Sequence, residues 1–326
     1  MTPTIYDVAV RAGVSISTVS LALNKPNRVR KTTLARVMSA VDELGFVPRA
    51  EAVTRARRGV RRIGVIGPFS SYSSFARRLN GILRGAMEEH FEVVVYDELS
   101  AATARLATLP LTGRVDGVIL LSLPFDDDVA SRLSEQRLAT VLVELQHPDF
   151  SSVAVDDEAG GRLVAELFTR HGHETVGYIG HAQAVDYQSP SQARLQGLCD
   201  GLTRPPRALM VEYDFESARA GTHELLSRPG SERPTAIFAH DDLLAAGALR
   251  AARDLGLRVP QEVEVVGFDD SELAEPLGLT TVRQPLEESG TVALELLLAH
   301  INDPARTAQH TTLALKLVER DTTRPA

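Results

Sequence analysis

The sequence of 326 residues contains one cysteine, Cys199, and no tryptophan. A single cysteine excludes an internal disulfide framework and a zinc site built from cysteines. No apolar run approaches the roughly 18 residues that a membrane span needs, and residues 1–11 lack the pattern of a signal peptide. With 23 glycines and 17 prolines, the chain is not of low complexity. We therefore expect a soluble, cytoplasmic protein of two or three domains.

Charge is unevenly distributed along the chain. The formal net charge is −8, but residues 1–62 hold 12 Lys and Arg against four acids, which leaves −16 for the remainder. A short basic head on an acidic body indicates a module that binds a polyanion, joined to a part that binds a different ligand. A solvated basic tail is the alternative interpretation.

Residues 4–48 carry the signals of three short helices. Thr4 and Asp7 form a capping-box pattern that opens the first helix. Gly13 ends this helix, because glycine tolerates the left-handed conformation of a tight turn, and Ser15 opens the second. Two short helices joined by a glycine turn, with a third completing a small core, indicate a helix-turn-helix. A three-helix protein-interaction module is the alternative, which the positive charge disfavours.

The second predicted helix would present its outer face to DNA. Val19 and Leu23 already fill its inner face, so Ile16 and Leu21 are expected outside rather than in the core. If these two were core residues, the recognition surface would shrink to Ser17 and Ser20. The residues placed against base edges in the major groove are Ile16, Ser17 and Leu21. The residues expected to hold phosphates are Arg28, Lys31 and Arg36.

From residue 62 onward, short apolar runs alternate with amphipathic stretches. The predicted strands are residues 63–66, 93–96, 118–121, 141–143, 153–155, 176–179, 209–211, 237–239 and 263–268. The predicted helices are residues 75–89, 161–170, 192–202, 217–226, 243–255 and 287–301. This alternation predicts an α/β fold with parallel sheets covered on both faces. The length suits two doubly wound subdomains rather than one.

Polar and aromatic residues follow several predicted strands, where ligands bind in such sheets. They are Ser70, Tyr72, Ser74, Ser122, Glu144, Tyr213, Asp214, Phe215, Asp241, Asp242, Asp269 and Asp270. Carboxylates accept hydrogen bonds from vicinal hydroxyls while an aromatic ring covers an apolar face. This combination suits a small polyhydroxylated molecule.

Several residues have a simpler structural interpretation. The paired aspartates could act as acid and base or bind a metal, but we expect a ligand contact and, for Asp242, a helix N-cap. His171 and His173 lack a third ligand at zinc spacing, so two surface histidines at a helix end are expected. Cys199 is interpreted as a small core residue. No glycine-rich nucleotide loop follows a strand, and we expect no catalytic residue, metal or cofactor.

The head resembles the LacI/GalR family of transcriptional regulators. The motifs that carry this resemblance are residues 4–9, 12–15, 18–20, 23–24 and 44–48. It continues through the body, for example at residues 115–119, 266–270 and 279–284. The resemblance implies a small all-α helix-turn-helix domain followed by a type I periplasmic-binding-protein-like body. It further implies a homodimeric regulator, most often a repressor, that binds a pseudo-palindromic DNA operator under the control of a small-molecule effector such as a sugar or polyol.

The resemblance extends the set of expected DNA contacts to Thr4, Ile16, Ser17, Thr18, Ser20, Leu21, Asn24, Arg28, Lys31, Arg49 and Arg55. Two hinge positions depart from the family pattern. Arg55 stands where the family has a leucine that wedges into the minor groove, and Arg49 replaces an asparagine. An arginine would instead lie in a narrowed minor groove.

In the body, the resemblance implies effector contacts from Arg194, Phe215, Asp241, Asp269 and Gln284. With the residues near the strand ends, the expected effector-binding set is Tyr72, Ser74, Phe75, Ser122, Glu144, Arg194, Phe215, Asp241, Asp269 and Gln284. Asp241 stands where the family usually has asparagine, and a second acid beside Asp269 disfavours anionic effectors. Phe215 stands where some sugar-responsive members have tryptophan.

The resemblance also implies a division of the chain. Residues 1–48 would form the DNA-binding domain, 49–60 the hinge and 61–326 the effector-binding and dimerisation domain. Within the last, an N-subdomain would span about 61–157 plus 285–314, and a C-subdomain about 158–284 plus 315–326. No heptads follow residues 313–318, so a dimer is expected rather than a tetramer.

Two rival functions use the same cleft. A solute-binding protein for transport would share the body's fold, but the helix-turn-helix and the lack of a signal peptide disfavour it. The second rival is a cytoplasmic protein that binds a sugar or nucleoside, or an enzyme acting on one. No activated nucleophile or metal site supports an enzyme.

Overall fold

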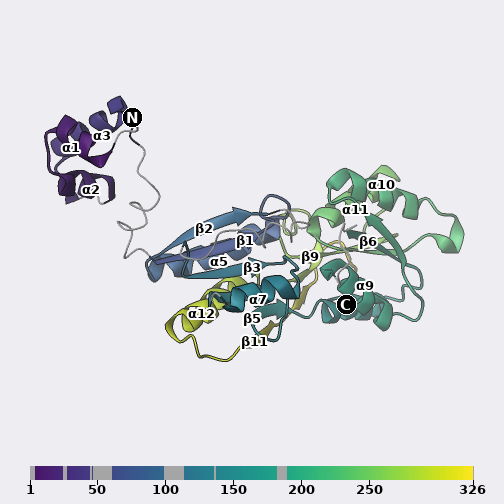
Figure 1. The fold of residues 1–326 in the computed structure, drawn as a ribbon. Coiled ribbons are helices and arrows are strands. Elements are labelled where there is room, and N and C mark those ends of the chain that lie inside the picture. The colour runs from purple at the N-terminus through teal and green to yellow at the C-terminus, as the bar shows by residue number, and fades with distance from the viewer. Residues whose placement is uncertain are drawn as a thin grey trace. The chain divides into compact units, whose positions relative to one another are not determined.

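The computed structural model describes residues 4–24, 28–44, 46, 61–98, 114–135, 137–181 and 189–325. The chain divides into two compact units, residues 1–61 and residues 62–326 (Figure 1). The expected hinge, with Arg49 and Arg55, lies outside the described residues.

The first unit contains the three predicted helices, α1 (Ile5–Ala12), α2 (Ile16–Asn24) and α3 (Lys31–Leu44). The capping box at the start of α1 is confirmed: the backbone N–H of Thr4 donates to Oδ2 of Asp7 at 2.7 Å, and Oγ1 of Thr4 accepts from the N–H of Asp7. Gly13 has φ of +64°, as the turn between α1 and α2 requires. Ser15 caps α2, because its Oγ accepts from the N–H of Thr18 at 3.2 Å.

The core of the first unit is formed by one face of each helix. Val8, Val19 and Val37 are fully buried there, with Ala22 and Phe46 beside them. The inward and outward faces of α2 are therefore those that helical spacing predicts.

The second unit contains two six-stranded sheets among its described residues. The first has the order β11-β5-β4-β3-β1-β2 and the second the order β12-β10-β9-β8-β6-β7. The strands of the first are β1 (Arg61–Gly67), β2 (Phe91–Asp97), β3 (Gly117–Leu121), β4 (Ala139–Val143), β5 (Ser151–Val155) and β11 (His310–Leu313). Those of the second are β6 (Val176–His181), β7 (Arg207–Val211), β8 (Ala236–Ala239), β9 (Glu264–Asp269), β10 (Thr280–Arg283) and β12 (Lys316–Val318).

The pairs β1–β3, β3–β4, β4–β5 and β5–β11 of the first sheet are parallel. In the second sheet, β6 pairs in parallel with β7 and β8, and β9 with β8 and β10. The short β12 runs antiparallel to β10 at its edge. Fully buried runs such as Gly117–Leu121 are typical of strands covered on both faces.

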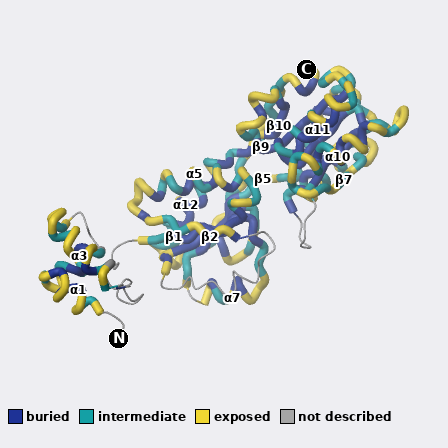
Figure 2. The backbone as a smooth tube through the Cα atoms, turned by 90° about the horizontal axis from the view of Figure 1, so that it is seen from above, coloured by how far each residue is buried: buried dark blue, intermediate teal, exposed yellow. Residues whose placement is uncertain are grey.

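Helices cover both faces of each sheet. The first sheet packs α5 (Ser73–Glu88) and α12 (Leu286–Asn302) on one face and α7 (Asp127–Glu135) on the other. The second packs α10 (Phe215–Leu226) and α11 (Asp242–Asp254) on one face and α8 (Asp157–Arg170) and α9 (Pro190–Gly201) on the other. Figure 2 shows the buried segments running along the strands of both sheets. The predicted pair of doubly wound layers is confirmed.

The sequence did not predict α7, β10, β11 or β12. These three strands span only three or four residues each, and threonine, arginine and lysine interrupt their apolar pattern. They form because neighbouring strands supply the pairing, which local sequence does not reveal. Among the described residues, no single helix is long and apolar enough to cross a membrane; α1 and residues 16–23 pass that test only as a pair bent by 102°.

Candidate effector pocket and DNA-binding surface

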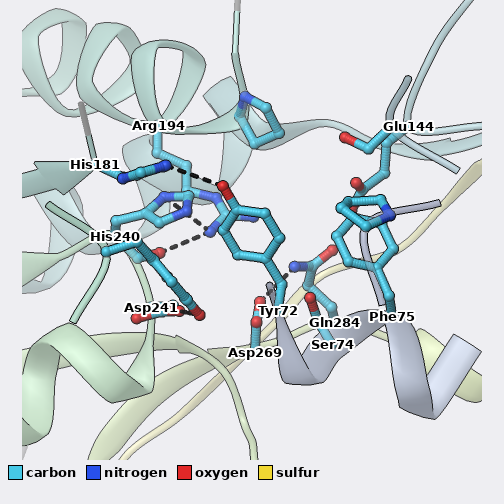
Figure 3. Close-up of a pocket in the computed structure, with 14 residues that line it drawn as sticks. Tyr72, Ser74, Phe75, Glu144, His181, Arg194, His240, Asp241, Asp269 and Gln284 are labelled. Atoms are coloured by element: carbon cyan, nitrogen blue, oxygen red, sulfur yellow. Dashed lines mark hydrogen bonds between the residues drawn. The ribbon is translucent and has the colours of Figure 1, made fainter. Parts of the chain in front are cut away.

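A pocket lies between the two sheets of the second unit, beyond the carboxyl ends of their strands (Figure 3). Ser122 follows β3, Glu144 follows β4, His181 ends β6 and Asp269 ends β9. This is where ligands bind in open α/β sheets. The full lining comprises Pro68, Tyr72, Ser74, Phe75, Ser122, Glu144, His181, Pro190, Arg194, Tyr213, His240, Asp241, Asp269 and Gln284.

The backbone is left-handed at three of these strand ends. The angle φ is +51° at Ser122, +63° at Glu144 and +101° at Asp269. Residues other than glycine rarely adopt such angles, and each costs about 1–3 kcal/mol. The surrounding fold therefore holds these three side chains in place against local strain, a pattern that is common at ligand sites.

Arg194, on α9, is a rigidly held donor at the back of the pocket. Its Nε donates to Oδ1 of Asp157 at 2.8 Å, and its Nη1 donates to the carbonyl oxygen of His240 at 2.6 Å. The guanidinium lies 3.6 Å from the ring centroid of Phe268, and the residue is 3% exposed. A planar donor fixed in this way can bind hydroxyl or carboxylate oxygens with defined geometry.

Asp241 is both a helix cap and a pocket acid. Its Oδ1 accepts from the N–H of Leu244 at 2.9 Å, and its Oδ2 accepts from the hydroxyl of Tyr213. Burial raises the pKa of Asp241 to about 6, and the charge of Asp269 acts in the same direction. The carboxyl therefore changes its protonation state within the physiological range.

Asp242 was expected to cap α11, but the structure corrects this assignment, because Asp241 is the cap. We call each sheet of the second unit, with the helices that cover it, a lobe. Asp242 is buried inside the second lobe, where Oδ2 accepts from the N–H of Ser271 and Oδ1 from the hydroxyl of Thr281, both at 2.6 Å. Burial raises its pKa to about 7. It supports the loop after β9 rather than lining the pocket.

A chain of hydrogen bonds connects the two sides of the pocket. The buried Arg78, on α5, pairs with Glu144 through Nη2, which also donates to Oε1 of Gln284 at 3.4 Å. Gln284 in turn donates through Nε2 to Oδ1 of Asp269 at 2.5 Å. Burial lowers the pKa of Arg78 to about 10, opposed by the charges of Asp269 and Asp157. One network thus fixes a carboxylate from each sheet.

Two histidines line the pocket beside these charges. Burial lowers the pKa of His181, and burial with the charge of Arg194 lowers that of His240 well below its usual value. Both are therefore neutral near pH 7. The other ionisable groups at the pocket and directly behind it are the carboxyls of Glu144, Asp157, Asp241 and Asp269 and the guanidiniums of Arg78 and Arg194.

Aromatic rings occupy the centre of the pocket. The rings of Tyr72 and Tyr213 have centroids 4.5 Å apart, and those of Tyr72 and Phe75 lie 5.8 Å apart. Only about 50 Å³ of open space remains among the lining residues, against roughly 300–1,000 Å³ in a typical ligand pocket. A ligand can therefore enter only if these rings move or the two sheets separate.

Nine of the ten residues expected from the sequence line this pocket, and Phe215 does not. Asp214 caps α10 by accepting from the N–H of Ser217 at 2.8 Å, so the helix begins at Phe215. Phe215 lines a separate hollow beside α11, and Tyr213 provides the aromatic ring instead. His181 and His240 were also missed, although His240 directly follows a predicted strand.

Close helix packing positions Arg194. At the crossing of α8 and α9, a Cβ on Gly197 would lie 1.9 Å from the carbonyl oxygen of Glu158. A Cβ on Gly161 would lie 2.1 Å from the carbonyl oxygen of Arg194 itself. Only glycine permits these approaches, so the two helices fix the distance of Arg194 from the second sheet.

The structure corrects two other predictions, those for the histidines at 171 and 173 and for Cys199. His171 and His173 are not surface histidines, because both imidazoles contact the buried carboxylate of Glu264. Their side chains are 7% exposed. Cys199 is half-buried rather than a core residue, and burial raises the pKa of its thiol.

In the first unit, the outer face of α2 is accessible. Ile16 and Leu21 are 39% and 37% exposed, and Ser17 is also exposed. Thr18 is half-buried and its hydroxyl lies 2.8 Å from that of Ser15. Thr4 caps α1, Ser20 is half-buried on α2, and the side chain of Asn24 lies outside the described set.

The basic residues of this unit differ in their partners. Arg11 pairs with Glu43 across α1 and α3. Arg28, Lys31 and Arg36 are exposed and form no ion pair with a described residue. All three are therefore available to an outside anion.

Comparisons with known proteins match two segments of the chain to family models. Residues 4–49 match the model of bacterial regulatory proteins of the lacI family, and residues 165–323 match the periplasmic binding protein-like domain. The HTH-type transcriptional repressor PurR of Edwardsiella ictaluri is 32% identical over 333 residues, covering 97% of this chain and 96% of the relative. That of Serratia proteamaculans is 31% identical over 329 residues, with the same coverage.

Solved structures are similar over the full length. The transcriptional regulator CelR in complex with cellobiose has a TM-score of 0.68 at 28% identity, covering 98% of this chain and 99% of the other. The lac repressor dimer bound to operator and the anti-inducer ONPF has a TM-score of 0.70 at 27% identity, covering 99% of each chain.

The fold and sites define a DNA-binding regulator with a periplasmic-binding-protein-like sensor domain. The chain belongs to the lacI family of bacterial regulatory proteins. The relatives are transcriptional repressors rather than enzymes.

Proposed function

We propose that this regulator is a homodimeric repressor whose operator affinity is controlled by a neutral sugar or related polyol in the pocket of the second unit. The observation that carries this proposal is the meeting of Arg194, Asp241 and Asp269 in one pocket with the rings of Tyr72 and Tyr213. Carboxylates accept from vicinal hydroxyls, a guanidinium donates to their oxygens, and rings cover C–H faces.

The printed ligands of similar proteins support a carbohydrate. CelR is solved with cellobiose, and a lacI-family regulator from Enterococcus faecium, 25% identical with a TM-score of 0.70 over 82% of this chain and all of the other, is solved with bound ribose. Acids outnumber bases around the pocket, which disfavours anionic effectors such as sugar phosphates.

The DNA-binding role rests on the exposed face of α2. In this proposal Ile16, Ser17 and Leu21 contact base edges. Arg28, Lys31 and Arg36 hold phosphates. Further contacts come from Thr4, Thr18, Ser20, Asn24, Arg49 and Arg55. Two copies related by a two-fold axis would meet the two half-sites of a pseudo-palindrome, as the operator-bound lac repressor dimer suggests.

We propose the division into residues 1–48, 49–60 and 61–326, with two subdomains in the last. Effector binding would change the relative orientation of these two subdomains. The hinge, residues 49–60, would transmit that change to the DNA-binding domain, residues 1–48. Coupling of this kind is reciprocal, so operator DNA must change effector affinity by the same factor. The chain would act in the cytoplasm, where operator DNA is found.

Selection from random duplex DNA with the purified full-length protein tests the first part. We expect an enriched inverted repeat, and removal of residues 1–60 should abolish its binding while effector binding remains. Specific binding by the shortened chain would refute the division.

A panel of neutral sugars, sugar phosphates and nucleosides, assayed for release or strengthening of that complex, tests the second part. A response only to anionic ligands would contradict the polyol assignment. Turnover of a panel member would favour the enzyme alternative, and ligand binding without any effect on DNA would favour a solute-binding protein.

A further inference from the structure

A cluster of three metal-ligating side chains lies in the second lobe, away from the effector pocket. His171 is the C-cap of α8, His173 follows two residues later, and Glu264 is the first residue of β9. One ligand atom from each lies within 4.8 Å of the others. Glu264 begins the strand that Asp269 ends. The cluster and the pocket therefore lie at opposite ends of β9, roughly 16 Å apart along the strand.

The geometry of the cluster is close to that of a metal site. Oε2 of Glu264 lies 2.8 Å from Nδ1 of His171 and 3.2 Å from Nε2 of His173. In a tetrahedral zinc site with bonds of about 2.0–2.1 Å, neighbouring ligand atoms are roughly 3.3 Å apart. Both carboxylate–imidazole separations therefore differ from this value by half an ångström or less, and all three ligand atoms lie within 4.8 Å of one another.

The side chains are also oriented for binding. Nδ1 of His173 lies 2.9 Å from Oγ1 of Thr235, and this hydrogen bond directs Nε2 toward Glu264 in the way that an outer partner orients a metal-binding histidine. A metal at Nδ1 of His171 requires the proton on Nε2, and Nε2 has no hydrogen-bond partner among the described residues. Moving the proton of His171 from Nδ1 to Nε2 therefore breaks no hydrogen bond of Nε2.

A cation already occupies one side of this carboxylate. Nε of Arg324 lies 2.5 Å from Oε1 of Glu264, and its Nη2 donates to the carbonyl oxygen of His171 at 2.8 Å. Nη2 also lies 3.2 Å from Nε2 of His173. Glu264 is fully buried, whereas the side chain of Arg324 is 47% exposed. The arginine can therefore turn out to solvent, which opens the cluster on that side.

We propose that His171, His173 and Glu264 form a binding site for a divalent transition-metal ion, Zn²⁺ in preference to Mg²⁺ or Ca²⁺. Two imidazole nitrogens and one carboxylate oxygen are a donor set that zinc accepts and that the harder ions, which take oxygen ligands, do not. Arg324 competes with the ion for Glu264, and water completes the coordination. The ion would fasten the end of α8 to the start of β9.

Zinc titration of the full-length protein, freed of metal with a chelator, tests this proposal. We expect one Zn²⁺ per chain by calorimetry and a rise of several degrees in the unfolding temperature, because the ion binds the folded state. Mg²⁺ should have no such effect. Cobalt should give the visible absorption of a four-coordinate site.

Variants assign the ligands. His171→Ala, His173→Ala and Glu264→Gln should each weaken zinc binding by more than the roughly 10–100-fold that loss of an outer partner costs. His223→Ala, at an exposed position of α10, is the matched control and should bind as the unaltered chain does. Weakening by His223→Ala alone would assign the ion elsewhere and overturn the proposal.

Arg324→Gln separates a metal site from a plain ion-pair network without removing a ligand. If Arg324 competes with the ion, this substitution strengthens zinc binding several-fold. If the cluster serves only as an ion-pair network, the variant is destabilised and zinc does not restore its unfolding temperature. That second result, or the lack of saturable zinc binding by the unaltered protein, would overturn the proposal.

Discussion

The hydroxyl oxygen of Tyr72 lies 2.9 Å from Nε2 of His181, although 109 residues separate them in the chain. Tyr72 precedes α5 beside the first sheet, whereas His181 ends β6 of the second. Their hydrogen bond, with the contact between the rings of Tyr72 and Tyr213, crosses the pocket between the two sheets. These side chains span the pocket, so their contacts must break when the rings move or the two sheets separate to admit a ligand.

Tyr72→Phe should increase effector affinity. The substitution keeps the ring and removes the bond to His181, which contributes about 0.5–1.5 kcal/mol to the arrangement that the effector disrupts. We expect affinity for the sugar found in the screen to rise by about two- to tenfold in calorimetry. Tyr96→Phe, within the first lobe, is the control and should change nothing. A lower affinity for Tyr72→Phe would show that this hydroxyl binds the ligand instead.

Arg194→Ala should remove the effector response and leave operator affinity near that of the unaltered chain. Hydrogen bonds from a charged donor contribute about 1.5–3 kcal/mol each, so the loss of one or two should lower effector affinity by at least tenfold. Calorimetry with the sugar and gel shift with the operator measure the two quantities. Unchanged effector affinity would exclude Arg194 from the site.

Gly197→Ala should weaken effector binding from a position that does not line the pocket. Its Cβ would meet the carbonyl oxygen of Glu158 at 1.9 Å, so α9 must move away from α8 and carry Arg194 with it. Overpacking of this kind costs about 1–3 kcal/mol of stability. Gln196→Ala, at an exposed position of the same helix, should cost only a few tenths of a kcal/mol. Calorimetry with the sugar and denaturant unfolding measure the two quantities. Equal losses of effector affinity and of stability for Gly197→Ala and Gln196→Ala would refute the packing argument.

Asp242 should make stability fall as pH rises from about 4 to about 7. Its pKa is raised from 3.8 to about 7 in the folded protein, so over this interval the folded state binds more protons than the unfolded state. The contribution reaches at most about 1.4 kcal/mol per pH unit. Denaturant unfolding of the unaltered chain and Asp242→Asn across this interval isolates it, because the variant lacks the titrating group. Parallel pH profiles would contradict the prediction.

Lys31→Ala and Ile16→Ala should affect DNA binding differently. Loss of a phosphate contact weakens binding to all sequences and lowers the slope of log affinity against log salt by about one per protomer. Loss of a base contact changes sequence preference in a repeated selection and leaves the slope unchanged. Arg11→Ala, whose charge is paired with Glu43, serves as the control. A reduced slope for Ile16→Ala would contradict the assignment of that residue to base edges.

The strand-end rule predicted the pocket well, because the topology of parallel sheets brings the ends of non-adjacent strands together whatever their loops contain. The rule was wrong where the N-cap of the following helix decides which side chain points into the pocket. Tyr213 and Phe215 are two residues apart after the same strand, and the capping of α10 by Asp214 turns only the first toward the pocket. Capping by Asp241 rather than Asp242 is a similar one-residue choice.

Partners distant in sequence were also beyond local reasoning. The histidines at 171 and 173 lacked a third ligand by spacing, and the fold supplied Glu264, 93 residues after His171. In the same way Arg78 lies in an amphipathic helix, where its burial becomes evident only when Glu144 and Gln284 are seen beside it.

The described chain passes from one sheet to the other three times: after β5, after β10 and between β11 and β12. Neither lobe is therefore encoded by one continuous stretch of the gene. A fragment cut at any single crossing would leave at least one sheet without an edge strand. When two such fragments are expressed together, one must supply the missing edge strand to the sheet of the other. This architecture therefore suits a split reporter, in which reassembly of the sensor domain reports that both fragments are present.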